Sequence, residues 1–169
     1  IYVCGITPYA STHLGHVFTY AAGDVLIRFL RYQGLPIHYV QNLTDIDDPI
    51  LKESKKEGEH WQELGRRWTV KYIDEMKTLN ILPPNDFPCA TEVIDSIVDT
   101  TRRLIEAGAA YESGGSVFFD VDSWNEFGKL SQLPRDRMLG IANDRGNRPD
   151  DPPKRDPLDF PLWQARESG

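Results

Sequence analysis

The chain has 169 residues, of which 40% are hydrophobic and 27% are charged, the usual composition of a soluble globular protein. Its net charge of −7 argues against a general nucleic-acid coat protein, which would be basic. No apolar stretch reaches the ~18–20 residues of a membrane span, so we expect no membrane association. The two cysteines, Cys4 and Cys89, are too few for a disulfide framework and favour a reduced, cytoplasmic protein.

Both ends of the sequence lie beside apolar runs. The chain opens on residues 1–3, which are apolar, and stops just after a second apolar run at residues 160–163. We therefore expect a piece of a longer protein that holds roughly one domain, since a domain has about 100–200 residues.

The first 50 residues follow the order strand, helix, strand. The apolar run at residues 1–3 predicts a strand, and residues 5–12 predict a polar loop. Apolar residues then recur every three or four positions over Leu14–Tyr32, which predicts an amphipathic helix that Gly34 ends. A second apolar run at residues 36–40 predicts another strand, and together these elements indicate a parallel β-α-β unit.

The rest of the chain indicates an α+β insertion followed by a return strand. The expected elements are, in order, helices at 50–57, 61–79 and 90–107, a hairpin at 111–119 turned by Gly114-Gly115, a helix at 133–143 and a strand at 160–163. We therefore expect an α/β fold in three parts. Residues 1–51 form the first half of a Rossmann-like nucleotide-binding fold, residues 52–142 a connective insertion, and residues 143–169 a return segment and strand into the second half.

The loop after the first strand is the most informative segment. His13 and His16 lie three residues apart at the start of the predicted helix, so their rings occupy neighbouring positions on its first turn. A helix start presents free N–H groups and a partial positive charge, which suit a phosphate. Gly15 would let a flat purine ring approach the backbone. A lone histidine here is more often a polar cap, but together these residues match the HIGH motif of class I aminoacyl-tRNA synthetases.

Cys4 lies at the carboxyl end of the first strand, where α/β folds place ligands. A thiolate there could bind zinc, whereas a lone cysteine is more often a small buried residue. The sequence lacks a matching set of cysteines and histidines at metal-binding spacing. Either Cys4 is not a ligand, or its partners lie beyond Gly169.

A third polar loop follows the second strand. Its carboxylates at Asp45, Asp47 and Asp48 could hold Mg²⁺. For Asp47 and Asp48 we favour capping of the next helix and bracing of the loop. Thr44 is small and polar enough to line a substrate pocket.

Taken together, the sequence resembles the catalytic domain of cysteinyl-tRNA synthetase and, equally, its close relative, the cysteine:glucosaminyl-inositol ligase of mycothiol synthesis. The resemblance covers nearly the whole chain and rests on the runs Tyr2–Tyr9, Thr12–His16, Tyr39–Asp48, Leu79–Pro84, Ala90–Glu92, Gly115–Phe119 and Lys154–Phe160. It implies the Rossmann-like, HUP-type catalytic fold of class I synthetases.

The resemblance also implies a reaction. ATP, with Mg²⁺, and L-cysteine would give cysteinyl-adenylate and pyrophosphate, and the cysteinyl group would then pass to an acceptor. Cys4 matches the first ligand of a Zn²⁺ ion that binds the substrate thiolate. His13 and His16 match the catalytic box on the ATP phosphates. Other positions match residues that line the ATP and adenylate site, namely Gly5, Ile6, Thr7, Gly15, Thr19, Asn42 and Thr44.

The acceptor stays open between two molecules. Ile6 and His16 are nearer the ligase, whereas the hairpin and the run Asp159–Trp163 are nearer the synthetase. The insertion and return strand favour tRNA(Cys), with an amino-sugar inositol as the alternative. A third hypothesis is a non-catalytic, synthetase-like nucleotide-binding module, against which the intact box argues.

Two further expectations follow from the resemblance. We expect a monomer. We also expect these residues alone to be inactive, because the remaining zinc ligands, the KMSKS-type loop and the anticodon-binding domain come later in the family.

Overall fold

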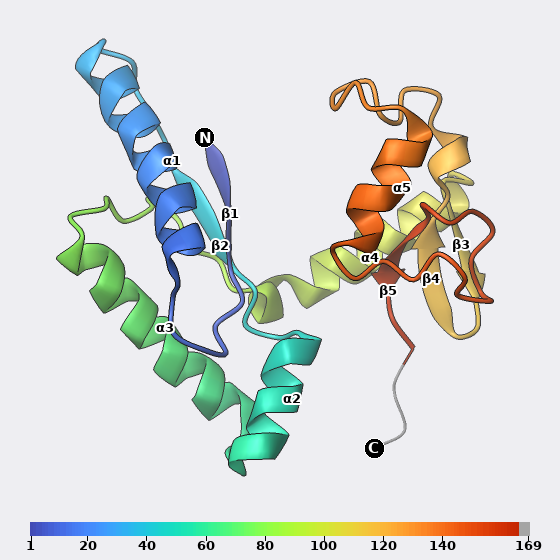
Figure 1. Ribbon diagram of the computed structural model, residues 1–169, viewed down its shortest axis with the longest axis horizontal. Helices are drawn as coiled ribbons and strands as arrows, with labels where there is room; N and C mark the ends of the chain where they lie inside the picture. The colour runs from blue at the N-terminus through green and yellow to red at the C-terminus, as the bar shows by residue number, and fades with distance from the viewer. Residues whose placement is uncertain (166–169) are drawn as a thin grey trace. The chain divides into compact units, whose positions relative to one another are not determined.

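The computed structural model describes residues 1–165 (Figure 1). The chain divides into two compact units, Ile1–Ile94 and Asp95–Gly169. Both units contain helices and strands, so the predicted α/β class is confirmed. The predicted boundaries after residues 51 and 142 stay predictions. No helix in the described part is both long and apolar enough to cross a membrane.

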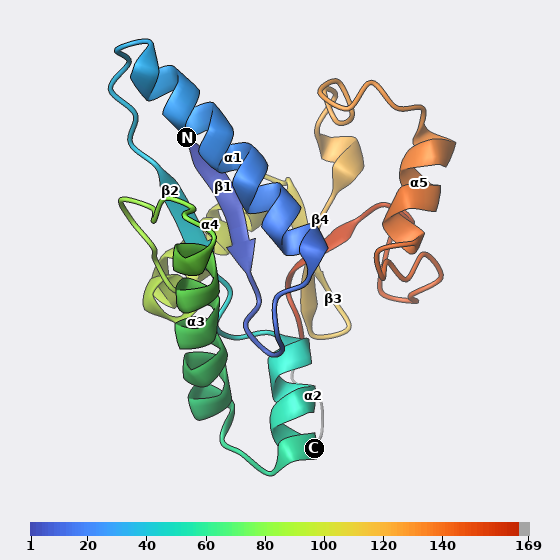
Figure 2. The same ribbon diagram turned by 60° about the vertical axis from the view of Figure 1, so that its left-hand side comes forward.

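The first unit opens with the parallel β-α-β arrangement that the sequence predicts. Strand β1 (Tyr2–Ile6) pairs in parallel with β2 (Val40–Leu43), and helix α1 (Leu14–Tyr32) joins them and lies against β1 (Figure 2). The predicted bounds of this helix are confirmed. The chain leaves it through Gly34, whose φ of 79° lies in the left-handed region that favours glycine.

The predicted ends of both strands are wrong. β1 continues to Ile6, and β2 begins only at Val40. The register explains both differences, because Tyr2 pairs with Val40 and Ile6 with Leu43. Residues 36–39 therefore lie ahead of the paired region, although their apolar side chains predict a strand.

A third segment, residues 85–89, runs along the other edge of β2. The Gln41 N–H donates to the Asp86 carbonyl (3.1 Å), and the Leu43 N–H donates to the Pro88 carbonyl (2.8 Å). Helices α2 (Asp48–Glu57) and α3 (Trp61–Thr78) lie side by side and connect β2 to this segment (Figure 1). Residues within the predicted insertion thus pair with a strand of the first part.

The core of this unit lies between the two strands, α1 and α3. Its buried members are Ile6, Tyr20, Leu43, Tyr72 and Met76. A polar chain runs beside them: the Tyr39 hydroxyl donates to Gln41 Oε1 (2.7 Å), and Gln41 Nε2 donates to the Tyr72 hydroxyl (2.5 Å). Burial raises the pKa of Tyr39 to about 12. Both polar atoms of the buried Gln41 side chain therefore have partners, which fix the centre of β2.

The second unit is built on a short antiparallel sheet. A 3₁₀ turn, η1 (Ala90–Val93), leads into α4 (Ile94–Glu106), and the hairpin follows as β3 (Ala110–Ser113) and β4 (Ser116–Phe119). The two residues that turn this hairpin, Gly114 and Gly115, have φ of 58° and 80°, the positive values that glycine favours. The predicted hairpin is therefore confirmed.

The sheet is completed from the end of the chain. A 3₁₀ turn, η2 (Val121–Ser123), and helix α5 (Arg135–Asn143) precede β5 (Phe160–Trp163), which pairs in antiparallel fashion with β4. The predicted helix at 133–143 and the predicted strand at 160–163 are thus present. The proposed continuation of this strand into a second half of the nucleotide-binding fold stays a prediction.

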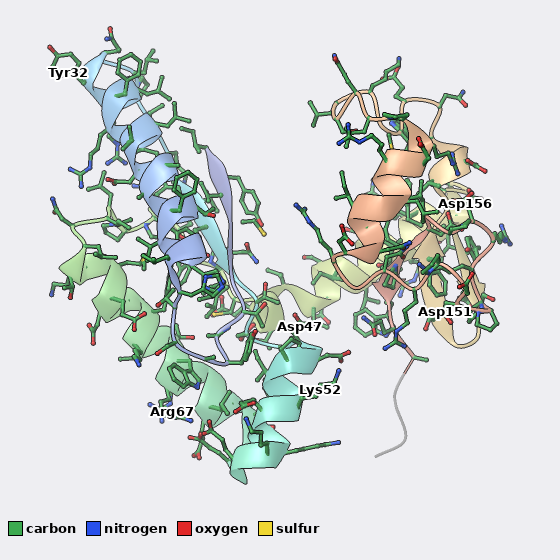
Figure 3. All side chains as sticks on the ribbon, in the orientation of Figure 1. Tyr32, Asp47, Lys52, Arg67, Asp151 and Asp156 are labelled. Atoms are coloured by element: carbon green, nitrogen blue, oxygen red, sulfur yellow. The ribbon has the colours of Figure 1, made fainter. Side chains whose placement is uncertain are left out.

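One buried carboxylate connects three segments of the second unit by hydrogen bonds. Asp159 is 0% exposed and accepts hydrogen bonds from the Tyr111 hydroxyl (2.6 Å), the Val121 N–H (3.0 Å) and the Asp156 N–H (3.0 Å). The Tyr111 hydroxyl in turn accepts from the Arg155 N–H (2.8 Å). The loop that leads to β5, where Figure 3 labels Asp156, is thereby fixed to the hairpin.

Candidate active site

The segments that the sequence analysis identified as functional lie at one end of the β1–β2 pair, where both strands finish. β1 leads into the loop that reaches α1, and β2 leads into the loop that reaches α2. Each loop follows the carboxyl end of its strand. Because the two strands are parallel, these two ends lie on the same side of the pair, and α/β folds bind ligands there.

Two histidines share the first turn of α1. His13 is the N-cap residue, and its Nδ1 accepts a hydrogen bond from the Gly15 N–H (3.1 Å). Its own N–H donates to His16 Nδ1 (3.5 Å). The two rings stack with their centroids 3.8 Å apart and their planes inclined by 20°. The predicted proximity of the two rings is therefore confirmed.

The environment favours a neutral His16. Its pKa is lowered from the usual value, first because the ring is partly withdrawn from water and second because His13 lies beside it. Since Nδ1 accepts the His13 N–H, a neutral ring carries its proton on Nε2 and can donate from there. Gly15 leaves room for this arrangement, because a Cβ on it would lie 2.9 Å from Cε1 of His13.

Strand β1 carries a bulge at Cys4–Gly5. Val3 pairs with Gln41 and Ile6 with Leu43, so three steps along β1 match two along β2. The strands approach so closely here that a Cβ on Gly5 would lie 1.5 Å from the Asn42 carbonyl oxygen. Only glycine fits this position, and the residue before it, Cys4, is an exposed free thiol.

Asn42 connects the two strands at this bulge. Its Oδ1 accepts hydrogen bonds from the Gly5 N–H (2.7 Å) and the Tyr2 hydroxyl (2.8 Å), and its Nδ2 donates to Thr44 Oγ1 (3.2 Å). The Thr44 N–H donates to the Ile6 carbonyl (3.0 Å). Tyr2 is a member of this group that sequence reasoning missed, because no pattern links residues 40 positions apart.

The two remaining threonines of the predicted site are hydrogen-bonded within the protein. The Thr7 hydroxyl donates to Asp47 Oδ2 (3.5 Å), which joins the two loops. The Thr19 hydroxyl donates to the Gly15 carbonyl (3.1 Å), so it is bonded to its own helix one turn beyond the histidines.

The acidic loop after β2 has a structural use. Asp47 is the N-cap of α2, where its Oδ1 accepts the Asp48 N–H (2.9 Å), so its predicted capping role is confirmed (Figure 3). Asp45 accepts both the N–H (3.0 Å) and the hydroxyl (2.5 Å) of Thr91. These two bonds connect the loop after β2 to η1, and the sequence alone did not indicate this contact.

Residues 1–169 match the catalytic domain family of class I tRNA synthetases (C). The chain belongs to this family. Because the match covers the whole sequence, the predicted class I synthetase catalytic fold is confirmed.

Curated relatives of this synthetase-family chain are named as cysteine ligases. Three L-cysteine:1D-myo-inositol 2-amino-2-deoxy-alpha-D-glucopyranoside ligases, from Mycolicibacterium vanbaalenii, Streptosporangium roseum and Streptomyces avermitilis, are 44%, 42% and 44% identical to it over its whole length. The chain covers 40%, 42% and 41% of these relatives. It therefore spans about two fifths of their length.

A zinc site is not completed by the described part of this synthetase-family chain. Cys4 is one candidate donor. Residues 1–165 contain no group of three or more His, Cys, Asp or Glu side chains that could hold a metal ion. Zinc sites in proteins use three or four protein ligands, so zinc at Cys4 stays a prediction, as does Mg²⁺.

The predicted site residues are gathered on consecutive segments of the synthetase-family chain. They lie in β1 and the loop after it, on the first turns of α1 and at the end of β2: Cys4, Gly5, Ile6, Thr7, His13, Gly15, His16, Thr19, Asn42 and Thr44. Ile6 differs from the others, because its side chain is buried in the core with 4% exposed. The roles of these residues in binding stay predictions.

Proposed function

We propose that the full-length protein is an ATP-dependent ligase that joins L-cysteine to the amino group of 1D-myo-inositol 2-amino-2-deoxy-α-D-glucopyranoside. The observation that carries this proposal is the identity of 42–44% with ligases of that name over the whole chain. The same relatives favour the amino sugar over tRNA(Cys), the acceptor that sequence analysis favoured.

The reaction takes place in two steps. A carboxylate oxygen of cysteine attacks the α-phosphorus of ATP, the bond to the β-phosphate bridge breaks, and pyrophosphate leaves. The sugar amine then attacks the carbonyl carbon of the adenylate. The bond from that carbon to the phosphate oxygen breaks, AMP leaves, and the new amide nitrogen loses a proton.

The start of α1 suits the first step. Negative charge grows on the phosphates as pyrophosphate departs, and fixed donors that already point at this charge lower the barrier. Nε2 of His16 and the exposed ring of His13 supply such donors, and the start of the helix adds a partial positive charge. Their contribution is positioning and charge stabilisation rather than covalent chemistry.

The bulge in β1 suits the amino-acid end of the substrate. The exposed Cys4 thiol lies in β1, which leads into the loop that reaches His13. Zinc bound there, with ligands from outside residues 1–165, would select the sulfur of cysteine over the hydroxyl of serine.

The test uses the full-length protein with ATP and L-cysteine, and with L-serine as the matched control. We expect cysteine-dependent exchange of labelled pyrophosphate into ATP, and an amide of the expected mass once the amino sugar is added. Charging of tRNA(Cys) without amide formation would overturn the proposed acceptor and leave the activation step in place. Absence of exchange would instead favour the non-catalytic module.

A further inference from the structure

We propose that Asn42 is a positioning residue: its side chain holds the Cys4–Gly5 bulge of β1 and thereby sets the direction in which the Cys4 thiol faces the cysteine site. The importance of that direction for catalysis rests on the proposed function. The geometry of the bulge does not.

The bulge changes which face of β1 each side chain occupies. In a regular strand, residues three apart point to opposite faces. Val3 and Ile6 are three apart, yet both pack on the core between the strands, α1 and α3. The extra residue in β1 makes this possible, because Val3 pairs with Gln41 and Ile6 with Leu43. The bulge therefore keeps two apolar side chains inside while Cys4 stays exposed.

The bulge also depends on Asn42 for its hydrogen bonding. A bulged residue disrupts the ladder of backbone bonds, so its N–H needs another acceptor. The Gly5 N–H finds it in Asn42 Oδ1 at 2.7 Å. The backbone oxygen of the same asparagine lies where a Gly5 Cβ would stand, so Asn42 contacts the bulge with both its main chain and its side chain.

Asn42 is itself held in place by two further hydrogen bonds. The Tyr2 hydroxyl donates to the same Oδ1 (2.8 Å), and Asn42 Nδ2 donates to Thr44 Oγ1 (3.2 Å). A side chain with three defined partners has one orientation, which is what a group that orients another must have. Its Oδ1 is already doubly occupied by protein donors, so this atom is better suited to positioning than to contacting substrate.

The chain offers a matched control in Asn85. Its Oδ1 accepts the Tyr39 N–H at 2.8 Å, which is the same kind of bond beside the other end of β2. Asn85→Ala removes a comparable bond from the same sheet while leaving the bulge untouched.

The experiment measures the rate at which iodoacetamide alkylates Cys4 in the full-length protein freed of metal by a chelator, read by peptide mass spectrometry and expressed as the ratio of variant to unsubstituted protein. We expect Asn42→Ala to change this labelling ratio several-fold and Asn85→Ala to leave it at one. An unchanged ratio in Asn42→Ala overturns the proposal. An equal change in both variants also overturns it, because it would show general loosening of the sheet.

A second variant and an activity assay complete the test. Tyr2→Phe removes only one of the bonds to Asn42 Oδ1, so it should change the ratio in the same direction and by less, even if Asn42→Ala fails to fold. In activity assays, Asn42→Ala should raise the KM for cysteine by about 10-fold or more, as misplacement of a binding group does, and should raise the KM for ATP by less. A labelling change without any cysteine activation would sustain the positioning role and reject the proposed function.

Discussion

Asp159 in the second unit and Asn42 in the first each join segments that are distant in the sequence, but the two side chains differ in their access to water. Asp159 is 0% exposed, and its three donors all belong to its own unit. Asn42 is only partly buried and lies where β2 opens into a loop. The enclosed carboxylate stabilises the hairpin unit, whereas the asparagine shapes a surface that a ligand can reach.

The difference predicts two kinds of mutant. Substitutions around Asp159 should lower stability and leave the geometry of the α1 loop alone. Substitutions at Asn42 should change the geometry of the candidate site more than the stability of the first unit. Gly5 is the exception on the Asn42 side, because its role is steric.

Gly5→Ala should have the largest effect. The added Cβ would lie 1.5 Å from the Asn42 carbonyl oxygen, so β1 and β2 cannot keep their register. We expect a loss of about 4 kcal/mol or more in the unfolding free energy of the first unit, among the largest values for single substitutions. Hydrogen exchange of the β1 and β2 amides, followed by mass spectrometry, measures this unit separately.

Gly140 supplies the control for that substitution. It lies inside α5, and a Cβ there would meet no atom within 4 Å. Gly140→Ala should therefore stabilise its helix by up to about 1 kcal/mol. Equal behaviour of the two alanine variants would contradict the steric account of Gly5.

Asp159→Ala should follow in size. It leaves the Tyr111 hydroxyl and two backbone N–H groups without their acceptor inside the second unit. Each buried donor left without its acceptor costs about 1–3 kcal/mol, so we expect a total loss of about 3–5 kcal/mol. Urea unfolding followed by near-ultraviolet circular dichroism would measure it. Asp99, a surface partner of Arg102, is the control, and its replacement by alanine should stay within about 1 kcal/mol.

Alkaline pH should weaken both units through their buried tyrosines. Burial, and then the bond to Asp159, raise the pKa of Tyr111 from 10.0 to about 12. A raised folded pKa means that the folded state keeps a proton that the unfolded state has lost. The stabilisation is therefore complete below pH 10 and is lost as the pH rises through about 12. Unfolding midpoints measured from pH 9 upward should fall, and Tyr111→Phe should reduce the slope; a slope that does not change would reject Tyr111 as a contributor.

Local signals predicted much of this fold. Apolar spacing and Gly34 placed α1 at its observed bounds, and Gly114-Gly115 placed the hairpin turn. Each of these features depends on residues that are near one another in the sequence. The two histidines were likewise found together, because three residues along a helix start bring their rings into contact.

The strand ends, the burial of individual side chains and the bulge depend on contacts between distant residues, so the sequence alone did not predict them. The apolar run at 36–40 predicts a strand, yet the register with β1 starts the strand at Val40. Periodicity predicts an apolar face on α1, but it does not separate Tyr20 and Ile27, which are buried, from Leu14 and Phe18, which are 85% and 77% exposed. The bulge was also hidden, because it exists only relative to β2.

The smallest predicted effect concerns His16 and pH. Its folded pKa lies below the usual 6.5, first through partial burial and then through His13. The folded state thus holds this proton less tightly than the unfolded state, so its contribution is complete above pH 6.5 and is lost as the pH falls through the lowered value. We expect slightly weaker protection of the first turn of α1 in mild acid, since His16 remains partly exposed.

A nuclear magnetic resonance titration of the His16 ring would separate its two causes. His13→Gln removes the neighbouring charge and leaves the burial, so the pKa of His16 should move only part of the way back toward 6.5. A complete return would make repulsion between the stacked rings the main cause.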